Sequence, residues 1–195
     1  MKVFDEKCTY HLILISKNGY KLFRSDSDKI KMLRIINEQI IDSGSAIYAF
    51  AIMDTHIHLE INSKNIKELA LNIIKAYTGY YSQKYSYQGA LFVYPPTIKD
   101  KPVLQWQVDT LIYIINNPIE ANMAKTYSEY KYSSYRFYTK EGSPLRSFIQ
   151  IDTSLFSNNF KSIFEFRIAA HAKLQYELEV KRFKVGLDHY RGGGQ

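Results

Sequence analysis

The sequence has little cysteine and no long apolar run, and both shortages limit the classes of protein it can be. Its single cysteine, Cys8, cannot form a disulfide within the chain, so a disulfide scaffold is excluded and a reducing compartment is expected. No apolar stretch approaches the roughly 20 residues that a membrane-spanning helix needs. Residues 1–7 mix charges and contain no apolar core, which argues against a secretory signal.

The remaining composition is that of a globular protein with a basic balance. Of the 195 residues, 46% are hydrophobic and 23% are charged, which excludes a disordered tail and a collagen-like fibre. There are 26 Lys and Arg against 19 Asp and Glu, a formal charge of +7 that favours an anionic partner. The 17 tyrosines are compatible with stacking surfaces for nucleic-acid bases and equally with a tyrosine-rich core.

The spacing of apolar residues predicts alternating strands and helices. Strands are expected at residues 9–15, 45–53, 56–61 and 91–98, the second of them as a buried central strand. Helices are expected at residues 26–41, 66–85, 104–117 and 160–183, with Pro118 ending the third and an irregular segment at 127–137. This order predicts an α+β fold, a ferredoxin-like antiparallel sheet with helices on one face.

Two histidines lie two residues apart on the predicted strand 56–61. Because side chains alternate along a strand, His56, His58 and Glu60 share one face. The Cβ atoms of the two histidines should lie roughly 6–7 Å apart, close enough for both imidazoles to bind one metal ion. Glu60 could orient a ligand or be one itself. A solvated strand face would show the same pattern, so the spacing leaves both interpretations open.

A tyrosine and an asparagine lie one turn apart on the predicted helix 104–117. Tyr113 and Asn117 are separated by four residues and therefore share one helical face. Taken alone, Tyr113 is compatible with a packed core residue, and Asn117 with a helix cap before Pro118.

Together these segments resemble a known family. His56-Ile57-His58 resembles the HUH motif, in which two histidines flank a hydrophobic residue. Residues 113–119 (YIINNPI) resemble the Tyr-Ile-x-x-Asn-Pro-Val segment of the single-tyrosine HUH transposases, the IS200-like and REP-associated enzymes. Further matching pieces stand in the family's order at residues 10–13 (YHLI), 89–92 (GALF) and 132–136 (YSSYR). The resemblance covers roughly residues 9–137.

The resemblance implies an activity and a set of roles. It implies a metal-dependent transposase that nicks and rejoins single-stranded DNA, often a hairpin, through a 5′-phosphotyrosine intermediate. Tyr113 would be the nucleophile, and His56, His58 and Asn117 would bind Mg²⁺ or Mn²⁺. The family's fold is the ferredoxin-like sheet that the element order already predicts.

The rest of the chain is assigned with this family in view. We expect a nuclease domain at residues 1–140 and a helical extension with a flexible tail at 141–195, the tail being the last residues, 192–195. DNA contacts are expected from basic residues that flank the site in sequence: Lys75, Lys84, Lys99, Lys101 and Arg136. A homodimer and a cytoplasmic bacterial location, on the nucleoid when bound to DNA, are also expected.

Two other functions compete with a mobile transposase. One is a domesticated protein that binds single-stranded DNA or hairpins without mobility. The complete set of His, Tyr and Asn residues argues against lost chemistry but not against domestication of an active enzyme. The other is a histidine-triad-like nucleotide hydrolase, because His-Ile-His-Leu begins that motif. Its third histidine would stand at position 60, where this chain has Glu60.

Overall fold

The structure is a computed structural model that describes residues 8–192, with side chains described as far as residue 183. Residues 1–7 and all but the first residue of the expected flexible tail lie outside the described residues. The strands are β1 (Cys8–Ile15), β2 (Ala46–Ile52), β3 (His56–Ser63) and β4 (Thr97–Asp100). The α-helices are α1 (Asp26–Asp42), α2 (Ile66–Tyr85), α3 (Leu104–Glu120), α4 (Ser154–Asn159) and α5 (Ile163–Gly192). Short 3₁₀ turns are η1 (Lys17–Gly19), η2 (Ser134–Tyr138) and η3 (Pro144–Ser147).

The four strands form one antiparallel sheet in the order β2-β3-β1-β4. In the register of β1 and β3, His11 lies opposite Glu60, and Ile15 lies opposite His56. Since directly opposite residues of an antiparallel pair share a face, His11 joins His56, His58 and Glu60 on the same side of the sheet.

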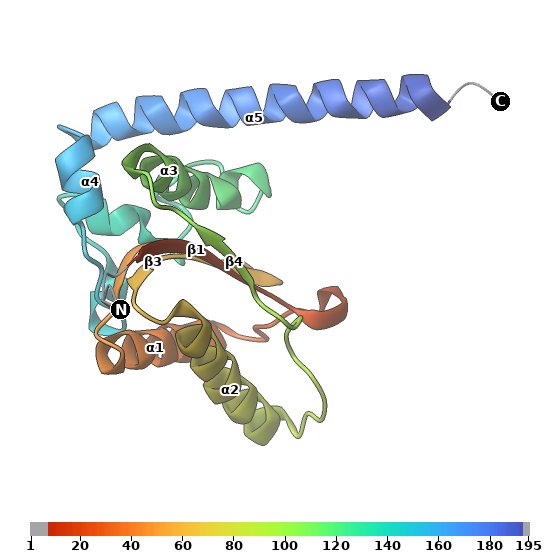
Figure 1. Ribbon diagram of the computed structural model, residues 1–195, viewed down its shortest axis with the longest axis vertical. Helices are drawn as coiled ribbons and strands as arrows, with labels where there is room; N and C mark the ends of the chain where they lie inside the picture. The colour runs from red at the N-terminus through yellow and green to blue at the C-terminus, as the bar shows by residue number, and fades with distance from the viewer. Residues whose placement is uncertain (1–7, 193–195) are drawn as a thin grey trace, which may run out of the picture.

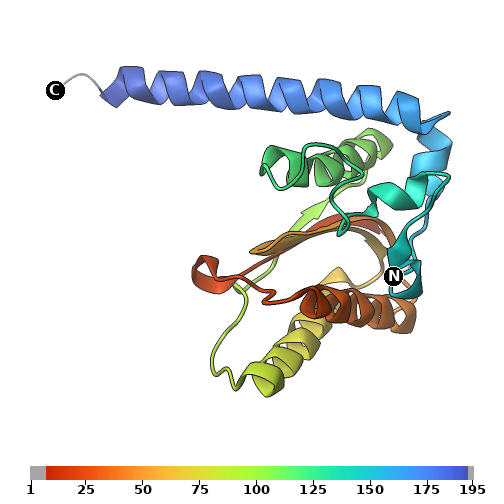
Figure 2. The same cartoon turned by 180° about the vertical axis from the view of Figure 1, so that it is seen from behind.

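Helices cover both faces of this sheet (Figures 1 and 2). Helices α1 and α2 lie on the face that carries Leu12 and Leu59, whereas α3 lies on the face that carries the histidines. The expectation of helices on one face therefore holds for α1 and α2 but not for α3. The reason lies in β2, where Ala49, Phe50 and the two residues after them are fully buried, so both of its faces need cover.

The apolar strand β2 is an edge strand, so its predicted central position is wrong. Its outer edge is covered by residues 127–137, the Tyr- and Ser-rich segment that the sequence predicts to be irregular. The backbone N–H of Ile52 donates to the carbonyl of Tyr132 at 2.9 Å, and that of Phe50 donates to Ser134 Oγ at 3.0 Å. An irregular segment thus satisfies the strand edge that a fifth strand would otherwise pair.

Two element boundaries differ from the predicted ones because of proline. Helix α3 passes through Pro118 and ends at Glu120. The proline is in the last turn, where its missing N–H costs only one helical hydrogen bond. Strand β4 begins at Thr97 and not at residue 91, because Pro95 and Pro96 have no N–H to donate to a neighbouring strand.

The C-terminal helix α5 packs across α3 and then extends past the rest of the molecule (Figure 1). At the contact, the buried Asn116 amide donates to the Ala170 carbonyl at 2.8 Å. Tyr138 stacks on Phe156 with ring centroids 4.7 Å apart, and both rings approach Phe166. No helix within residues 8–192 combines the length and apolar character needed to cross a membrane.

Candidate active site

The two histidines of β3 lie side by side on the face beneath α3. The rings of His56 and His58 are nearly perpendicular, with centroids 4.8 Å apart. His56 is half-buried and His58 is buried. A solvated strand face, the alternative interpretation of the pattern, does not describe this pair.

Helix α3 delivers Tyr113 and Asn117 to the same place. The ring of Tyr113 lies 5.6 Å from the ring of His58, measured between centroids, and meets it edge-on. The Asn117 side chain hydrogen-bonds His58, while its Nδ2 donates to the Tyr113 carbonyl at 2.9 Å. The amide oxygen of Asn117 is therefore the atom available to His58. The structure brings together all four residues that the sequence suggests for metal binding and nucleophilic attack.

A third histidine, His11 on β1, belongs to this cluster and was missed from the sequence. Its Nε2 lies 3.0 Å from Nδ1 of His58, and its ring centroid lies 5.6 Å from that of Tyr113. His11 thus contacts Nδ1 of His58. A polar residue inside the apolar run 9–15 was the signal that could have revealed His11.

The environment of all three imidazoles favours the neutral form. Burial lowers the pKa of His58 to about 2, with smaller contributions from His11 and His56, and Asn117 opposes the shift. Burial, followed by the charges of Lys101 and Lys99, lowers the pKa of His11 to about 3. Burial also lowers the pKa of His56. Neutral imidazole is the form that binds metal ions.

Glu60 lies deeper in the fold than the histidine pair. It is fully buried, and neither carboxylate oxygen has a hydrogen-bond partner among the described residues. Burial raises its pKa to about 9, against the opposing charge of Lys101. Within residues 8–192, no group of three His, Cys, Asp or Glu side chains is placed to hold a metal ion. Beside the two histidines, the oxygen-bearing side chain that the structure places at His58 is that of Asn117.

A cleft of about 270 Å³ opens in front of Tyr113 and His11. Lys99 and Lys101, both suggested as DNA contacts, line it from β4 and the residue that follows. Helix α5 contributes Lys173, which lies 3.2 Å from Asp109. The cleft is thus basic on the β4 side, whereas on the other side Lys173 is accompanied by Asp109 and Glu177.

The other three suggested DNA contacts do not line this cleft. Lys75 is exposed on α2, on the far side of the sheet. Lys84 is bound to the buried Asp28 carboxylate at 2.6 Å. Arg136 is half-buried in η2, and its Nε has no hydrogen-bond partner among the described residues. Proximity in sequence did not translate into proximity at the cleft, because these residues lie on other elements.

Comparisons with known proteins identify a matching family segment and a similar fold. Residues 5–91 match the family model described as "Transposase IS200 like", a segment that contains both histidines of β3 and ends before Tyr113. A solved structure of a REP-associated tyrosine transposase bound to a REP hairpin is similar in fold, with a TM-score of 0.60. It is 13% identical and covers 78% of this chain and 91% of its own.

A second solved structure and a sequence search complete the comparison. A putative transposase from Deinococcus radiodurans R1 is 17% identical over 60% of this chain and 95% of its own, with a TM-score of 0.41. No curated protein matches the sequence. The antiparallel α+β fold is confirmed, and the family suspected from the sequence is the one whose model matches residues 5–91.

Proposed function

From the premise that residues 5–91 are an IS200-like transposase domain, we propose that this protein nicks and rejoins single-stranded DNA through Tyr113. The observation that carries the proposal is the convergence of Tyr113 and Asn117 from α3 on His56 and His58 of β3. A hairpin is the proposed form of the DNA, because the similar solved transposase is bound to a REP hairpin.

The site offers nitrogen and oxygen donors that fit a divalent metal ion. The two neutral imidazoles supply nitrogen, and the Asn117 amide oxygen faces the ring of His58. Mg²⁺ or Mn²⁺ bound there would offset the negative charge of a phosphodiester and make its phosphorus accessible to attack. His11 would hold the ring of His58 in position through their 3.0 Å hydrogen bond, as outer partners of metal-binding histidines do.

The remaining chemistry belongs to Tyr113 and the lysines. Attack by the Tyr113 oxygen forms a bond to phosphorus and breaks the bond to the 3′ oxygen. The phenol proton is lost to solvent, and the departing 3′ oxygen gains a proton, which leaves a 5′-phosphotyrosine and a 3′-OH. Lys99 and Lys101 line the cleft and would hold neighbouring phosphates. Because the covalent link conserves the phosphodiester bond, a 3′-OH can attack it later and rejoin the strands.

Replacement of the nucleophile tests this function. Tyr113→Phe removes one oxygen and keeps the ring that packs against His11 and His58, so the fold should be retained. Hairpin DNA labelled on the 3′ side of the cleavage site is incubated with Mn²⁺ and run on a denaturing gel. The wild type and a control variant, Tyr94→Phe at an exposed tyrosine, should both give a labelled protein band, and Tyr113→Phe should give none.

Two results would count against the proposal. A labelled band that persists in Tyr113→Phe would assign the nucleophile to another tyrosine. Hairpin binding without a band in any of the three proteins would favour the domesticated DNA-binding protein.

The wider assignments are part of the same proposal. Residues 1–140 would form the nuclease domain, and residues 141–195 an extension whose Lys173 reaches the cleft. We expect the protein to act in the bacterial cytoplasm, where its DNA substrate lies. A homodimer remains a prediction.

A further inference from the structure

A second cavity, of about 520 Å³, lies beyond the end of β1. Its walls come from residues 17–24, from residues 87–91 and from α2, and none of its lining residues lines the cleft at Tyr113. Three cations and three tyrosines line it: Lys17, Lys21, Arg24, Tyr20, Tyr81 and Tyr87. Among the described residues that form these walls there is no carboxylate.

The two loops that form the walls are fastened to each other. The backbone N–H of Lys17 donates to the Leu91 carbonyl at 2.9 Å, and that of Val93 donates to the Ile15 carbonyl at 2.8 Å. Asn18, with φ 59°, adopts the left-handed conformation that asparagine tolerates better than most residues. The cavity is therefore part of the folded structure and needs no rearrangement to form.

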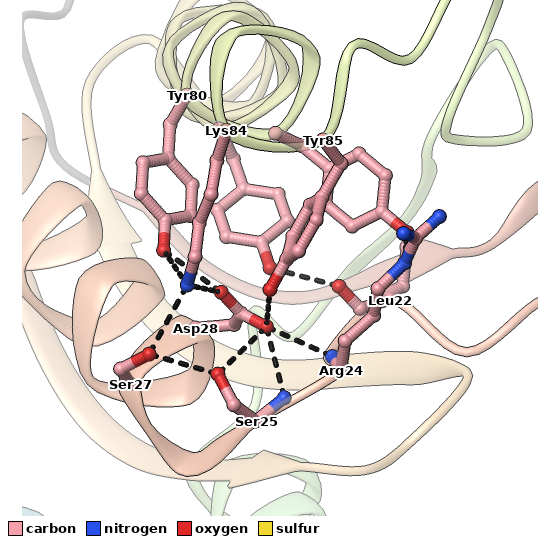
Figure 3. A network of polar contacts seen from close by, with 10 residues as sticks. Leu22, Arg24, Ser25, Ser27, Asp28, Tyr80, Lys84 and Tyr85 are labelled. Carbon is pink, nitrogen blue, oxygen red and sulfur yellow. Dashed lines mark hydrogen bonds and ion pairs between the residues drawn. The ribbon is translucent and has the colours of Figure 1, made fainter.

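The terminal edge of the Arg24 guanidinium points away from the protein groups that Arg24 contacts. Its backbone N–H donates to Asp28 Oδ2 and its Nε donates to the Tyr81 hydroxyl, both at 2.9 Å, while the guanidinium carbon lies 4.3 Å from the centre of the Tyr85 ring. Figure 3 shows the terminal nitrogens pointing away from the Asp28 carboxylate. The charge of Asp28 is matched by Lys84 at 2.6 Å and not by Arg24. An oriented guanidinium edge of this kind suits a phosphate, which accepts two parallel hydrogen bonds.

The tyrosines supply the second half of a nucleotide site. Tyr81 is buried and forms part of the wall, whereas Tyr20 is 59% exposed at the loop that carries the lysines. An exposed ring beside cations suits a base stacked on the ring with its phosphate held next to it. The side chain of Lys21 is 75% exposed and its ammonium lies 3.9 Å from Asp54, a weak ion pair that leaves its charge available to a ligand.

The cavity and the candidate active site meet at one turn. The N–H of Ser16, the residue before Lys17, donates to the Thr55 carbonyl at 2.8 Å. The Thr55 hydroxyl lies 3.1 Å from Nδ1 of His56. A DNA strand bound at the histidines can therefore continue towards the cavity.

We propose that this cavity binds one nucleotide of the substrate DNA, outside the position of cleavage. Arg24, Lys17 and Lys21 bind its phosphate, and Tyr20 stacks on its base. The inference rests on the proposed function in one respect, namely that the substrate is DNA.

Binding measurements on three proteins test the cavity. The probe is a fluorescein-labelled oligo(dT) of about 12 nucleotides in EDTA, a length within the usual site size for single strands, so that cleavage plays no part. Tyr20→Ala should weaken binding about 5- to 150-fold, since a stacked base is worth roughly 1–3 kcal/mol. Lys17→Ala/Lys21→Ala should reduce the slope of log K against log salt by up to about 0.7, the value for one phosphate that is no longer neutralised.

The control carries two lysine changes elsewhere on the surface. Lys67→Ala/Lys140→Ala removes the same charge away from the cavity, and Lys67 lies at the opposite end of α2. This variant should bind oligo(dT) within about twofold of the wild-type affinity. Its slope of log K against log salt should be closer to that of the wild type than the slope of Lys17→Ala/Lys21→Ala is. A further check uses the wild-type protein and so does not depend on whether the variants fold. An oligonucleotide that contains 5-iodouracil should crosslink under ultraviolet light to a peptide containing Tyr20.

The outcomes separate this inference from the proposed function. Wild-type binding in both cavity variants, or a crosslink only to peptides outside residues 17–24 and 81–91, overturns the cavity assignment even where Tyr113 forms its adduct. Weakened binding in the cavity variants with a crosslink at Tyr20 supports it, even if Tyr113→Phe fails to remove the adduct. Absence of oligo(dT) binding by the wild type overturns the cavity assignment as well.

Discussion

The buried carboxylate of Asp28 fastens the start of α1 to the end of α2, and its removal should destabilise the protein strongly. Asp28 is fully buried and is surrounded by donors from α2 and from the two residues that precede α1 (Figure 3). The donors are the N–H groups of Arg24 and Ser25 and the side chains of Ser25, Tyr80, Lys84 and Tyr85, at 2.6–3.1 Å. The same carboxylate also closes the capping box of α1 with Ser25.

The magnitude follows from what each donor can do once Asp28 is gone. Hydrogen bonds to a charged group contribute about 1.5–3 kcal/mol each. Lys84 is about one-third exposed and can turn to water, so the loss is smaller than the sum. We expect Asp28→Ala to cost about 3–5 kcal/mol, the range for removing one partner of a buried ion pair. At roughly 2–4 °C per kcal/mol for a chain of this size, Tm should fall by about 6–20 °C.

The adjacent Asp26 provides the matched control. It also lies in the first turn of α1, but its side chain is 66% exposed and its partner Lys131 is 54% exposed. Asp26→Ala should therefore cost about 1 kcal/mol or less. Thermal melting followed by circular dichroism measures both variants against the wild type.

The loss of stability caused by Asp28→Ala should also depend on pH, and it should become smaller in acid. Burial raises the pKa of Asp28, but hydrogen bonds from Lys84, Tyr85 and Tyr80 outweigh it and hold the pKa well below its ordinary value. A carboxyl group with a depressed folded-state pKa stabilises the fold above the unfolded pKa of about 4, and this contribution is lost as the pH falls below that value. The gap between wild type and Asp28→Ala should be full at about pH 7 and shrink below about pH 4. Equal Tm values for Asp28→Ala and Asp26→Ala, or a gap that widens in acid, would refute the reasoning.

Two further predictions concern the histidine cluster. Calorimetric titration with Mn²⁺ should show no binding to His58→Ala, and unchanged affinity in that variant would remove the proposed metal assignment. Glu60→Gln should keep the wild-type affinity within about twofold, because Glu60 forms no three-residue metal-binding group with the histidines among the described residues. His11→Phe fills the same space but cannot hydrogen-bond His58, so Mn²⁺ affinity should fall about 10- to 100-fold, with partial recovery in His11→Gln, and wild-type affinity in His11→Phe would exclude the orienting role.

The local patterns of the sequence determined most of the strands and long helices, and half of the site. The alternation of residues 56–61 sets His56 and His58 on one face of β3, and the four-residue spacing sets Tyr113 and Asn117 on one face of α3. These relations depend only on the period of a strand or a helix, which is why they could be predicted. The family resemblance then linked the two pairs and assigned their roles.

Tertiary packing decided the rest, because it joins residues that no local period relates. His11 reaches His58 across 47 residues of chain, and Asp28 collects donors from Tyr80 and Tyr85, which are 52 and 57 residues away. The composition of the sequence does not identify these hydrogen-bond partners, because a buried polar group bonds to the donor that the packing of the elements places beside it. The side of the sheet that α3 covers, the position of β2 at the edge and the convergence of cations and tyrosines on one cavity were likewise fixed only when the helices packed on the sheet.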